Sequence, residues 1–225
     1  MLTQAIGEML PAALAVTLSP FPIIAIVLLL GTTQARRNGF AFMIGWIIGL
    51  AALTAVVMLL ITTVDDHGSA ASRLVSWARV LGGAGLITLA WRKWTSRPRE
   101  GVIAVPPAWM ARISTSTPAR SVVLGLVLAG LNVKNLALVT SGTSSITDLG
   151  IEGHQAVVAA AIFVFLGSLS VIVTMLVHVV GGERSVAPLE SVKQFMTANN
   201  NVIMMTILLI LGAKILGDGI SGLSV

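Results

Sequence analysis

Six apolar stretches of about membrane-spanning length constrain the fold of this chain more than any other feature. They lie near residues 9–30, 40–61, 75–92, 120–140, 155–179 and 201–217. An α-helix of about 20 residues crosses the roughly 30 Å hydrocarbon layer of a bilayer. Only 10% of the 225 residues are charged, whereas a soluble domain needs roughly a quarter. We therefore predict one all-α integral membrane domain over residues 1–225, with six transmembrane helices.

The lysines and arginines predict the direction in which these helices cross. Most of them follow the first, third and fifth helices, at Arg36, Arg37, Arg92, Lys93, Arg97, Arg99, Arg112, Arg120, Arg184 and Lys193. Cytoplasmic loops of membrane proteins collect basic residues. We therefore expect these loops to be cytoplasmic and both termini to face outward.

The composition also narrows the classes of function. The net charge of +5 sits in loops beside apolar stretches, so it does not indicate a nucleic-acid partner. The chain has no cysteine, which rules out disulfides and thiolate metal sites. The predicted helices contain no paired carboxylates, no metal-ligand spacing, no serine–histidine pair and no phosphate loop. We expect no metal, no cofactor and no enzymatic activity.

The two halves of the chain resemble each other weakly. Shifting the second half onto the first places Gly167 on Gly45 and Lys214 on Arg92, and all connections but one are short. Because each half has an odd number of helices, the two halves would cross the membrane in opposite senses, as in many secondary transporters. This division gives a first three-helix repeat over 9–92, a cytoplasmic proline-rich linker over 93–119 and a second three-helix repeat over 120–217.

Ser19-Pro20-Phe21-Pro22 interrupts the first predicted helix near its middle. Prolines lack an amide proton and crowd the preceding turn, so carbonyl groups there lose their helical partners. Such groups need protein or water around them inside a membrane. Either the break exposes helix ends that bind a polar group of the substrate, or it is a simple proline kink.

Asn132-Val133-Lys134-Asn135 occupies the corresponding position in the second half. A lysine in the middle of a membrane helix costs about 2.5–3.5 kcal/mol on insertion scales, so it is expected to have a partner. Either Asn132, Lys134 and Asn135 bind substrate together with the first break, or Lys134 extends along its stem to the membrane surface.

Two further groups of charged residues are candidates for function. Glu8 or Asp218 could pair with Lys134 and exchange protons during transport, or both carboxylates could mark helix ends in water. The basic residues of two loops could bind anionic headgroups or act only as topology signals. These are Arg36, Arg37, Arg92 and Lys93.

Several segments together resemble a known family. They are residues 15–25 (AVTLSPFPIIA), 38–42 (NGFAF), 45–46 (GW), 107–110 (PAWM), 117–120 (TPAR) and 131–136 (LNVKNL). In this order and spacing they resemble the glycolipid-addressing (GAP) family, which is placed in the lysine-exporter (LysE) superfamily. That family usually has proline at the position of Val133, so we expect the second break to be less sharp.

The resemblance implies a membrane transporter or transport accessory in the cytoplasmic membrane of mycobacteria-like bacteria. It would move cell-envelope glycolipids or peptidoglycolipids from the cytoplasmic leaflet toward the surface, with membrane lipids as its partners. A homodimer and a larger lipid-export complex both stay open. The alternative function is the export of amino acids or another small polar metabolite, driven by the proton motive force. A lipid path needs an apolar groove that opens sideways, whereas a metabolite site is closed and polar.

Overall fold

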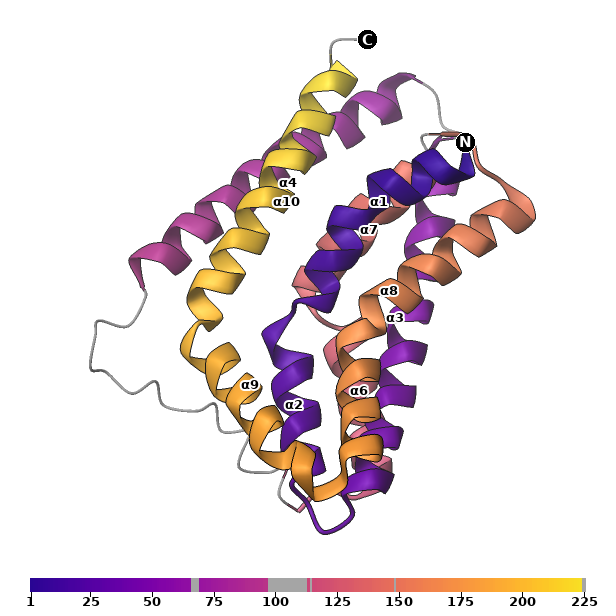
Figure 1. Ribbon diagram of the computed structural model, residues 1–225. Coiled ribbons are helices and arrows are strands. Elements are labelled where there is room, and N and C mark those ends of the chain that lie inside the picture. The colour runs from indigo at the N-terminus through magenta and orange to yellow at the C-terminus, as the bar shows by residue number, and fades with distance from the viewer. Residues whose placement is uncertain (66–68, 97–112, 114, 148, 224–225) are drawn as a thin grey trace.

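The computed structural model describes residues 1–65, 69–96, 113, 115–147 and 149–223, and these are almost entirely helical (Figure 1). The helices are α1 (Leu2–Thr17), α2 (Pro20–Leu30), α3 (Ala35–Asp65), α4 (Ser69–Thr95), α6 (Pro118–Gly130), α7 (Val133–Thr147), α8 (Gly153–Gly181), the 3-10 turn η1 (Gly182–Ser185), α9 (Val186–Ala198) and α10 (Asn200–Leu223). The described residues include no strand, so the all-α prediction is confirmed.

Length and composition identify three helical segments that could each cross a membrane alone. They are Ala35–Ile61, Gly153–Ala198 and Asn200–Leu223. The bent pairs α1–α2 and α6–α7 raise the number to five if each pair is one span. A multi-pass membrane protein is thereby confirmed. The exact number of six and the inverted repeat stay predictions, because the charged helix α4 is not among these candidate spans.

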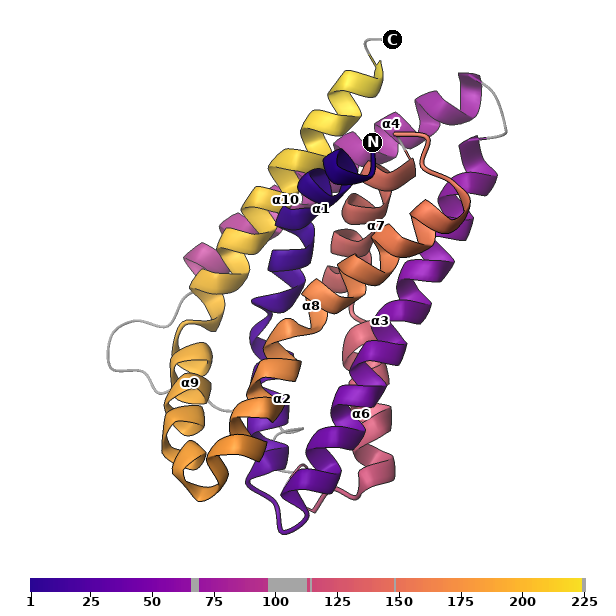
Figure 2. The ribbon, with the colours of Figure 1, turned by 45° about the vertical axis from the view of Figure 1, so that its right-hand side comes forward.

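Both termini lie at the same end of the bundle (Figures 1 and 2). The connections from α2 to α3 and from α8 to α9 lie at the opposite end. This arrangement agrees with an even number of crossings. The side of the membrane that each end faces stays a prediction.

Glycines allow two helix pairs to pack with their backbones close together. A Cβ atom added to Gly83 of α4 would lie 2.6 Å from the backbone nitrogen of Leu216 and 2.8 Å from the carbonyl oxygen of Gly212, both in α10. In the pair α3–α6, a Cβ on Gly45 would overlap the backbone of Val122. Small residues at such contacts let membrane helices approach closely and pack by van der Waals contact.

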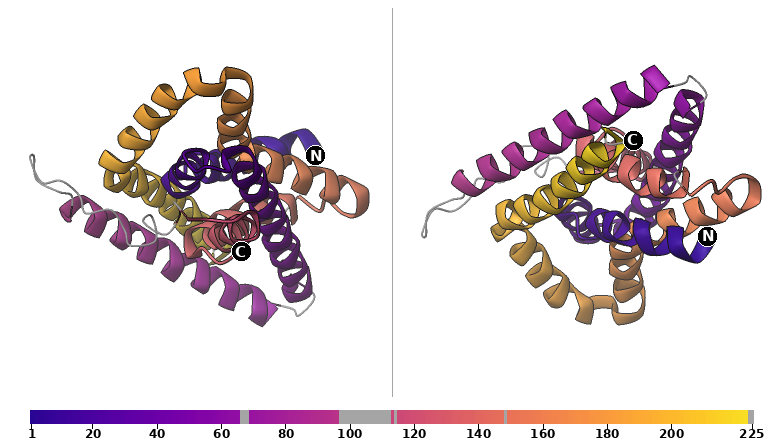
Figure 3. Two further views of the ribbon diagram at one scale, coloured as in Figure 1. Left: turned by 90° about the horizontal axis from the view of Figure 1, so that it is seen from below. Right: turned by 90° about the horizontal axis from the view of Figure 1, so that it is seen from above.

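The connection before the last helix is longer and more ordered than the short loop that we expected. Helix α9 (Val186–Ala198) lies beside α2 at the lower end of the bundle and leads up into α10 (Figures 1 and 3). Its Leu189 is buried, whereas Val192 and Phe195 are exposed. The expectation was wrong because this segment has too many polar residues to register as an apolar stretch, although its Leu189 joins the hydrophobic core.

The predicted linker falls mostly on residues that the structure does not describe. Residues 97–112 lie outside the described residues, and so do Arg97, Arg99 and Arg112 of the topology argument. The two ends of the linker are helical, since α4 continues to Thr95 and α6 begins at Pro118.

Candidate functional site

The first helix is broken where the sequence predicted. Helix α1 ends at Thr17 and α2 begins at Pro20, with a bend of 46° between them. Ser19 is extended and fully buried, and among the described residues its hydroxyl has no hydrogen-bond partner. Pro20 and Pro22 are buried as well, so the break faces the interior of the bundle.

The second break is sharper than the first, at 57°, although it has no proline. The side-chain oxygen of Asn132 accepts a hydrogen bond from the backbone N–H of Lys134 at 3.0 Å and begins α7. The Asn135 amide donates to the carbonyl oxygens of Leu128 and Ala129, both at 3.1 Å, and closes the end of α6. Our expectation of a weaker break at Val133 was wrong, because the two asparagines satisfy the backbone groups that a break leaves open.

Lys134 connects the two breaks directly. Its ammonium group donates to the carbonyl oxygen of Ala15 at 3.2 Å, and the side chain is buried. In an unbroken helix this carbonyl would accept from the N–H of Ser19, which instead donates to Val16 at 3.1 Å. The lysine therefore replaces the partner that the break removes. It also lies at the C-terminal end of α1, where the helix dipole favours a positive charge.

Helix α8 packs against the first break. The hydroxyl of Thr17 donates to the carbonyl oxygen of Leu166, across a sequence separation of 149 residues. A Cβ added to the neighbouring Gly167 would lie 3.1 Å from a methyl group of Val16 and 2.9 Å from one of Leu50. Helices α1, α3 and α8 thus meet at the level of this break.

The carboxylates that we considered as partners for Lys134 have other contacts in this conformation. Glu8 accepts a hydrogen bond from the exposed Gln4 at 3.0 Å. Asp218 forms an ion pair with Lys214 at 3.1 Å, one helical turn away on α10. In this conformation, and among the residues that the structure describes, Lys134 donates to a carbonyl at the end of α1 that lies within its reach.

The basic residues considered as headgroup contacts lie on two separate helices. Arg36 and Arg37 are exposed in the first turn of α3, whereas Arg92 and Lys93 lie in the last turn of α4. In the part of the chain that the structure describes, these four side chains therefore do not form one cluster.

An apolar groove of about 640 Å³ runs between α3 and α8. Its lining includes Leu59 and Val157, which are 66% and 68% exposed, so the groove opens on the outer surface of the bundle. Two hydroxyl-bearing residues are its polar members. Thr54 donates to Leu50, whereas Ser168 is fully buried and its hydroxyl has no partner among the described residues.

A polar part of α7 was missed at the level of sequence. The fourth apolar stretch was predicted to end near residue 140, but α7 continues to Thr147. The added segment contains Ser141, Thr143, Ser144 and Ser145, all of them buried. Buried threonine hydroxyls are satisfied within the helix by carbonyls of the preceding turn, as Thr143 donates to Val139 at 2.8 Å. Residues 140–147 (TSGTSSIT) are the stretch of sequence that could have revealed this polar segment.

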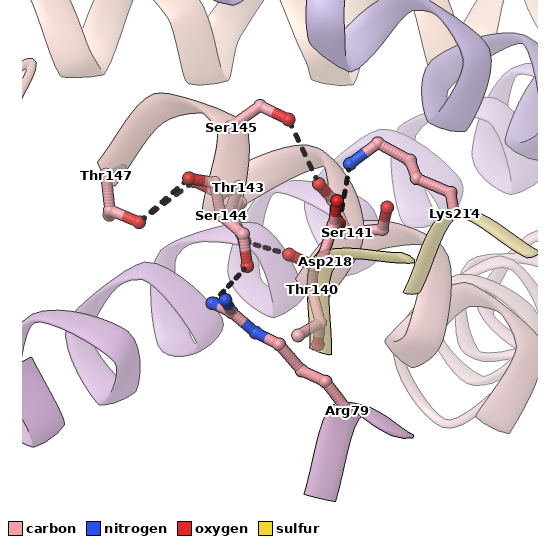
Figure 4. Close-up of polar contacts among 9 residues, drawn as sticks. All are labelled: Arg79, Thr140, Ser141, Thr143, Ser144, Ser145, Thr147, Lys214 and Asp218. Atoms are coloured by element: carbon pink, nitrogen blue, oxygen red, sulfur yellow. Dashed lines mark hydrogen bonds and ion pairs between the residues drawn. The ribbon is translucent and has the colours of Figure 1, made fainter. Parts of the chain in front are cut away.

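Arg79 of α4 is a second group that the sequence did not single out. Its guanidinium group donates to the Ser144 hydroxyl of α7 at 3.5 Å (Figure 4).

In the part of the chain that the structure describes, no three histidines or carboxylates gather in a way that could hold a metal ion.

Comparison with protein families supports the resemblance seen in the sequence. A family model described as Sap, sulfolipid-1-addressing protein, matches residues 9–221, which is nearly the whole chain. No curated protein and no solved structure matches the chain.

Proposed function

The chain belongs to the family of sulfolipid-1-addressing proteins, and we propose that it moves cell-envelope glycolipids or peptidoglycolipids toward the cell surface. Membership of this family supports a role in lipid localisation or transport. The direction, from the cytoplasmic leaflet outward, is part of our proposal, and so is membership of the lysine-exporter superfamily. The protein would act as the transporter or as an accessory to it.

The observation that carries this proposal is the groove between α3 and α8. A volume of about 640 Å³ is in the range of sites that bind drug-sized ligands, roughly 300–1,000 Å³, so it has room for part of an acyl chain. Its walls are apolar apart from Thr54 and Ser168. A small polar metabolite needs many more hydrogen-bonding groups when it leaves water. The exposed rim at Leu59 and Val157 would let a chain enter from the bilayer.

The inner side of the same groove borders the first break. Ser168 lines the groove, and the adjacent Gly167 packs against Val16 of α1. A lipid with its chain in the groove would have its headgroup near Ser19 and Lys134. This supports a substrate-binding role for the two broken segments that the sequence predicted.

The architecture of six spans in two inverted repeats belongs to the same proposal. In each half, a broken helix (α1–α2 or α6–α7) precedes a long helix (α3 or α8) and then one member of the α4–α10 pair. Helix α4 would be the third crossing. Its charged side chains are tolerable beside α10 and α7, because arginines in membrane segments turn toward protein or water. The membrane would be the bacterial cytoplasmic membrane, with both termini outside.

A tryptophan in the groove tests the proposed function. We expect Ala160→Trp, in the wall contributed by α8, to lower lipid movement by at least about tenfold by filling the space for the chain. The measurement is the transfer of a fluorescent glycolipid between leaflets of proteoliposomes, read by chemical quenching of the outer leaflet.

The matched control is Val173→Trp, which changes an exposed position of the same helix outside the groove. It should transport like the wild type. Unchanged transport by the Ala160 variant would contradict the proposal. Efflux of labelled amino acids without any lipid movement would favour the alternative, a metabolite exporter driven by the proton motive force.

A further inference from the structure

Helices α4 and α10 form a pair that packs closely on itself. The contact at Gly83 continues toward the C-terminus of α10, where a Cβ added to Gly219 would lie 2.7 Å from the backbone nitrogen of Val80. Further along, a Cβ on Gly222 would lie 3.4 Å from the Cβ of Ser76. Interfaces packed this closely have low compressibility and transmit a displacement. We therefore expect α4 and α10 to move together.

The same pair packs much less closely against the other described helices. Beyond the contact between them, α4 and α10 touch the rest of the bundle at few positions. A cavity of about 240 Å³ separates α10 from α1 and α7, and another of about 400 Å³ lies between the pair and helices α3 and α7. A long hydrogen bond of 3.5 Å, from Arg79 to Ser144, joins the pair to α7 (Figure 4). Close packing within the pair and open space beside it mark a boundary at which helices can shift.

The junction of α9 and α10 has the features of a hinge. Helix α9 ends at Ala198 and packs beside α2, whereas α10 begins at Asn200. The side-chain oxygen of Asn200 is buried and has no hydrogen-bond partner among the described residues. Such a group is costly in one conformation and can gain a partner in another. Helix α10 can therefore tilt at this junction while α9 stays beside α2.

The smaller cavity leads to Lys134. Ala15, whose carbonyl accepts a hydrogen bond from the Lys134 ammonium group, lines this cavity together with Ser141 of α7. Ser141 is 3% exposed, and no described residue bonds to its hydroxyl. An ammonium group has three protons to donate, and a described residue accepts one of them. In this conformation both groups lack hydrogen bonds that water would supply.

We propose that the α4–α10 pair is a gate, which tilts as one body away from α1 and α7 and admits water to Lys134. The cavity is lined by the half of α1 and of α10 nearer to the termini, so the gate opens toward that end of the bundle (Figure 1). It shares no lining residue with the groove between α3 and α8. The gate's role in lipid transfer rests on the proposed function, whereas the movement itself does not.

The reactivity of single cysteines tests the movement, because the chain has no cysteine of its own. Ser141→Cys lies in the wall of the cavity, whereas Val139→Cys is fully buried on the same helix and lines neither cavity. In proteoliposomes, we expect a membrane-impermeant maleimide to modify Ser141→Cys at least about tenfold faster than Val139→Cys. Equal rates would overturn the gate.

A cross-link between α1 and α10 tests the role of the gate in transfer. Leu14→Cys and Ile210→Cys line the same cavity, and the two native side chains are 48% and 58% exposed, so a reagent can reach both. Joining these cysteines with a short bis-maleimide should lower glycolipid transfer by at least about tenfold, because the gate can no longer open. Each single-cysteine variant treated with the same reagent should transfer lipid like the wild type.

The matched control ties the pair to itself. Ser76→Cys and Gly222→Cys would place their Cβ atoms 3.4 Å apart, close to the spacing of about 3.5–4.5 Å found in disulfides. This disulfide should leave transfer unchanged, because its two helices move together. Loss of transfer that reduction restores would place the movement within the pair and overturn the proposal. Thermal unfolding of every variant before cross-linking shows whether it is folded.

The gate and the proposed function fail in different ways. If the wild type transfers no lipid, the proposed function is wrong, and the rates of Ser141→Cys and Val139→Cys still decide whether the pair moves. Wild-type transfer by the cross-linked variant of Leu14 and Ile210 would leave the proposed function standing and overturn the gate. Loss of transfer in Ala160→Trp does not bear on the cysteine rates, since that residue lines the groove and not the cavity.

Discussion

Lys134 has an unusual environment for a lysine in an apolar helix, because its buried ammonium group bonds to a backbone carbonyl. The Ala15 carbonyl is available only because the chain breaks at Ser19 and Pro20. Conversely, the lysine is tolerated because the C-terminal end of α1 carries partial negative charge. The first break therefore depends on a lysine from the second half of the chain, and that buried lysine depends on a carbonyl from the first half.

Replacing Lys134 by methionine tests this link at the scale of one residue. The variant keeps much of the side chain's length but leaves the Ala15 carbonyl without its donor. An unsatisfied buried backbone group costs about 1–3 kcal/mol, so we expect a lower thermal unfolding temperature in detergent. If the two breaks form the transport path, glycolipid transfer should also fall by at least about tenfold.

Lys214→Met is the control for loss of a positive charge. Lys214 is partly exposed, and its ion pair with Asp218 on the surface of α10 contributes at most about 1 kcal/mol. This variant should unfold close to the wild type. Equal stability of the two lysine variants would show that the contact with Ala15 contributes nothing.

At the scale of elements, the pair α4–α10 depends on glycines that face the partner helix. Gly83 lies so close to α10 that a methyl group would meet the backbone at Gly212 and Leu216. The preceding Gly82 has no atom within 4 Å of the same hypothetical methyl group. Substituting each of these two adjacent glycines therefore distinguishes an effect on helix packing from an effect on helix propensity.

We expect Gly83→Ala to destabilise the protein by about 1–3 kcal/mol through overpacking against α10. Gly82→Ala should be neutral or stabilising by up to about 1 kcal/mol, because alanine favours helix more than glycine does. Denaturation in mixed micelles measures both. A similar effect of the two substitutions would show that close packing of α4 on α10 is not what stabilises this pair.

The two bent helix pairs, at 46° and 57°, are formed by different chemistry. In α1–α2 the prolines remove backbone donors, whereas in α6–α7 Asn132 and Asn135 satisfy the backbone groups that the bend exposes. Proline can be read from the sequence as a break because its effect is local. The asparagines could be read only as polar residues, because their effect depends on where the chain turns.

At the scale of the whole molecule, both termini share one end of the bundle and α9 lies at the other. If the basic loops are cytoplasmic, a residue near the N-terminus faces outward and α9 faces the cytoplasm. The chain has no cysteine, so single cysteines can report this orientation without background labelling.

We expect Thr3→Cys, exposed in α1, to react in intact cells with a maleimide that does not cross membranes. Ser191→Cys, exposed in α9, should react only after the membrane is permeabilised. The opposite pattern would invert the predicted topology, and labelling of both cysteines in intact cells would contradict a shared cytoplasmic location for α9 and the basic loops.

The sequence by itself determined that this is a membrane protein, the approximate positions of its helices and the break at Ser19–Pro22. These features follow from local chemistry, since hydropathy, charge and proline act on their own stretch of chain. The tertiary structure decided which side chains meet: Lys134 with Ala15, Arg79 with Ser144, and the groove between α3 and α8. Inside a membrane, lipid is as apolar as the protein interior, so hydrophobicity does not reveal which face of a helix is buried. Only packing between helices from distant parts of the chain makes that choice.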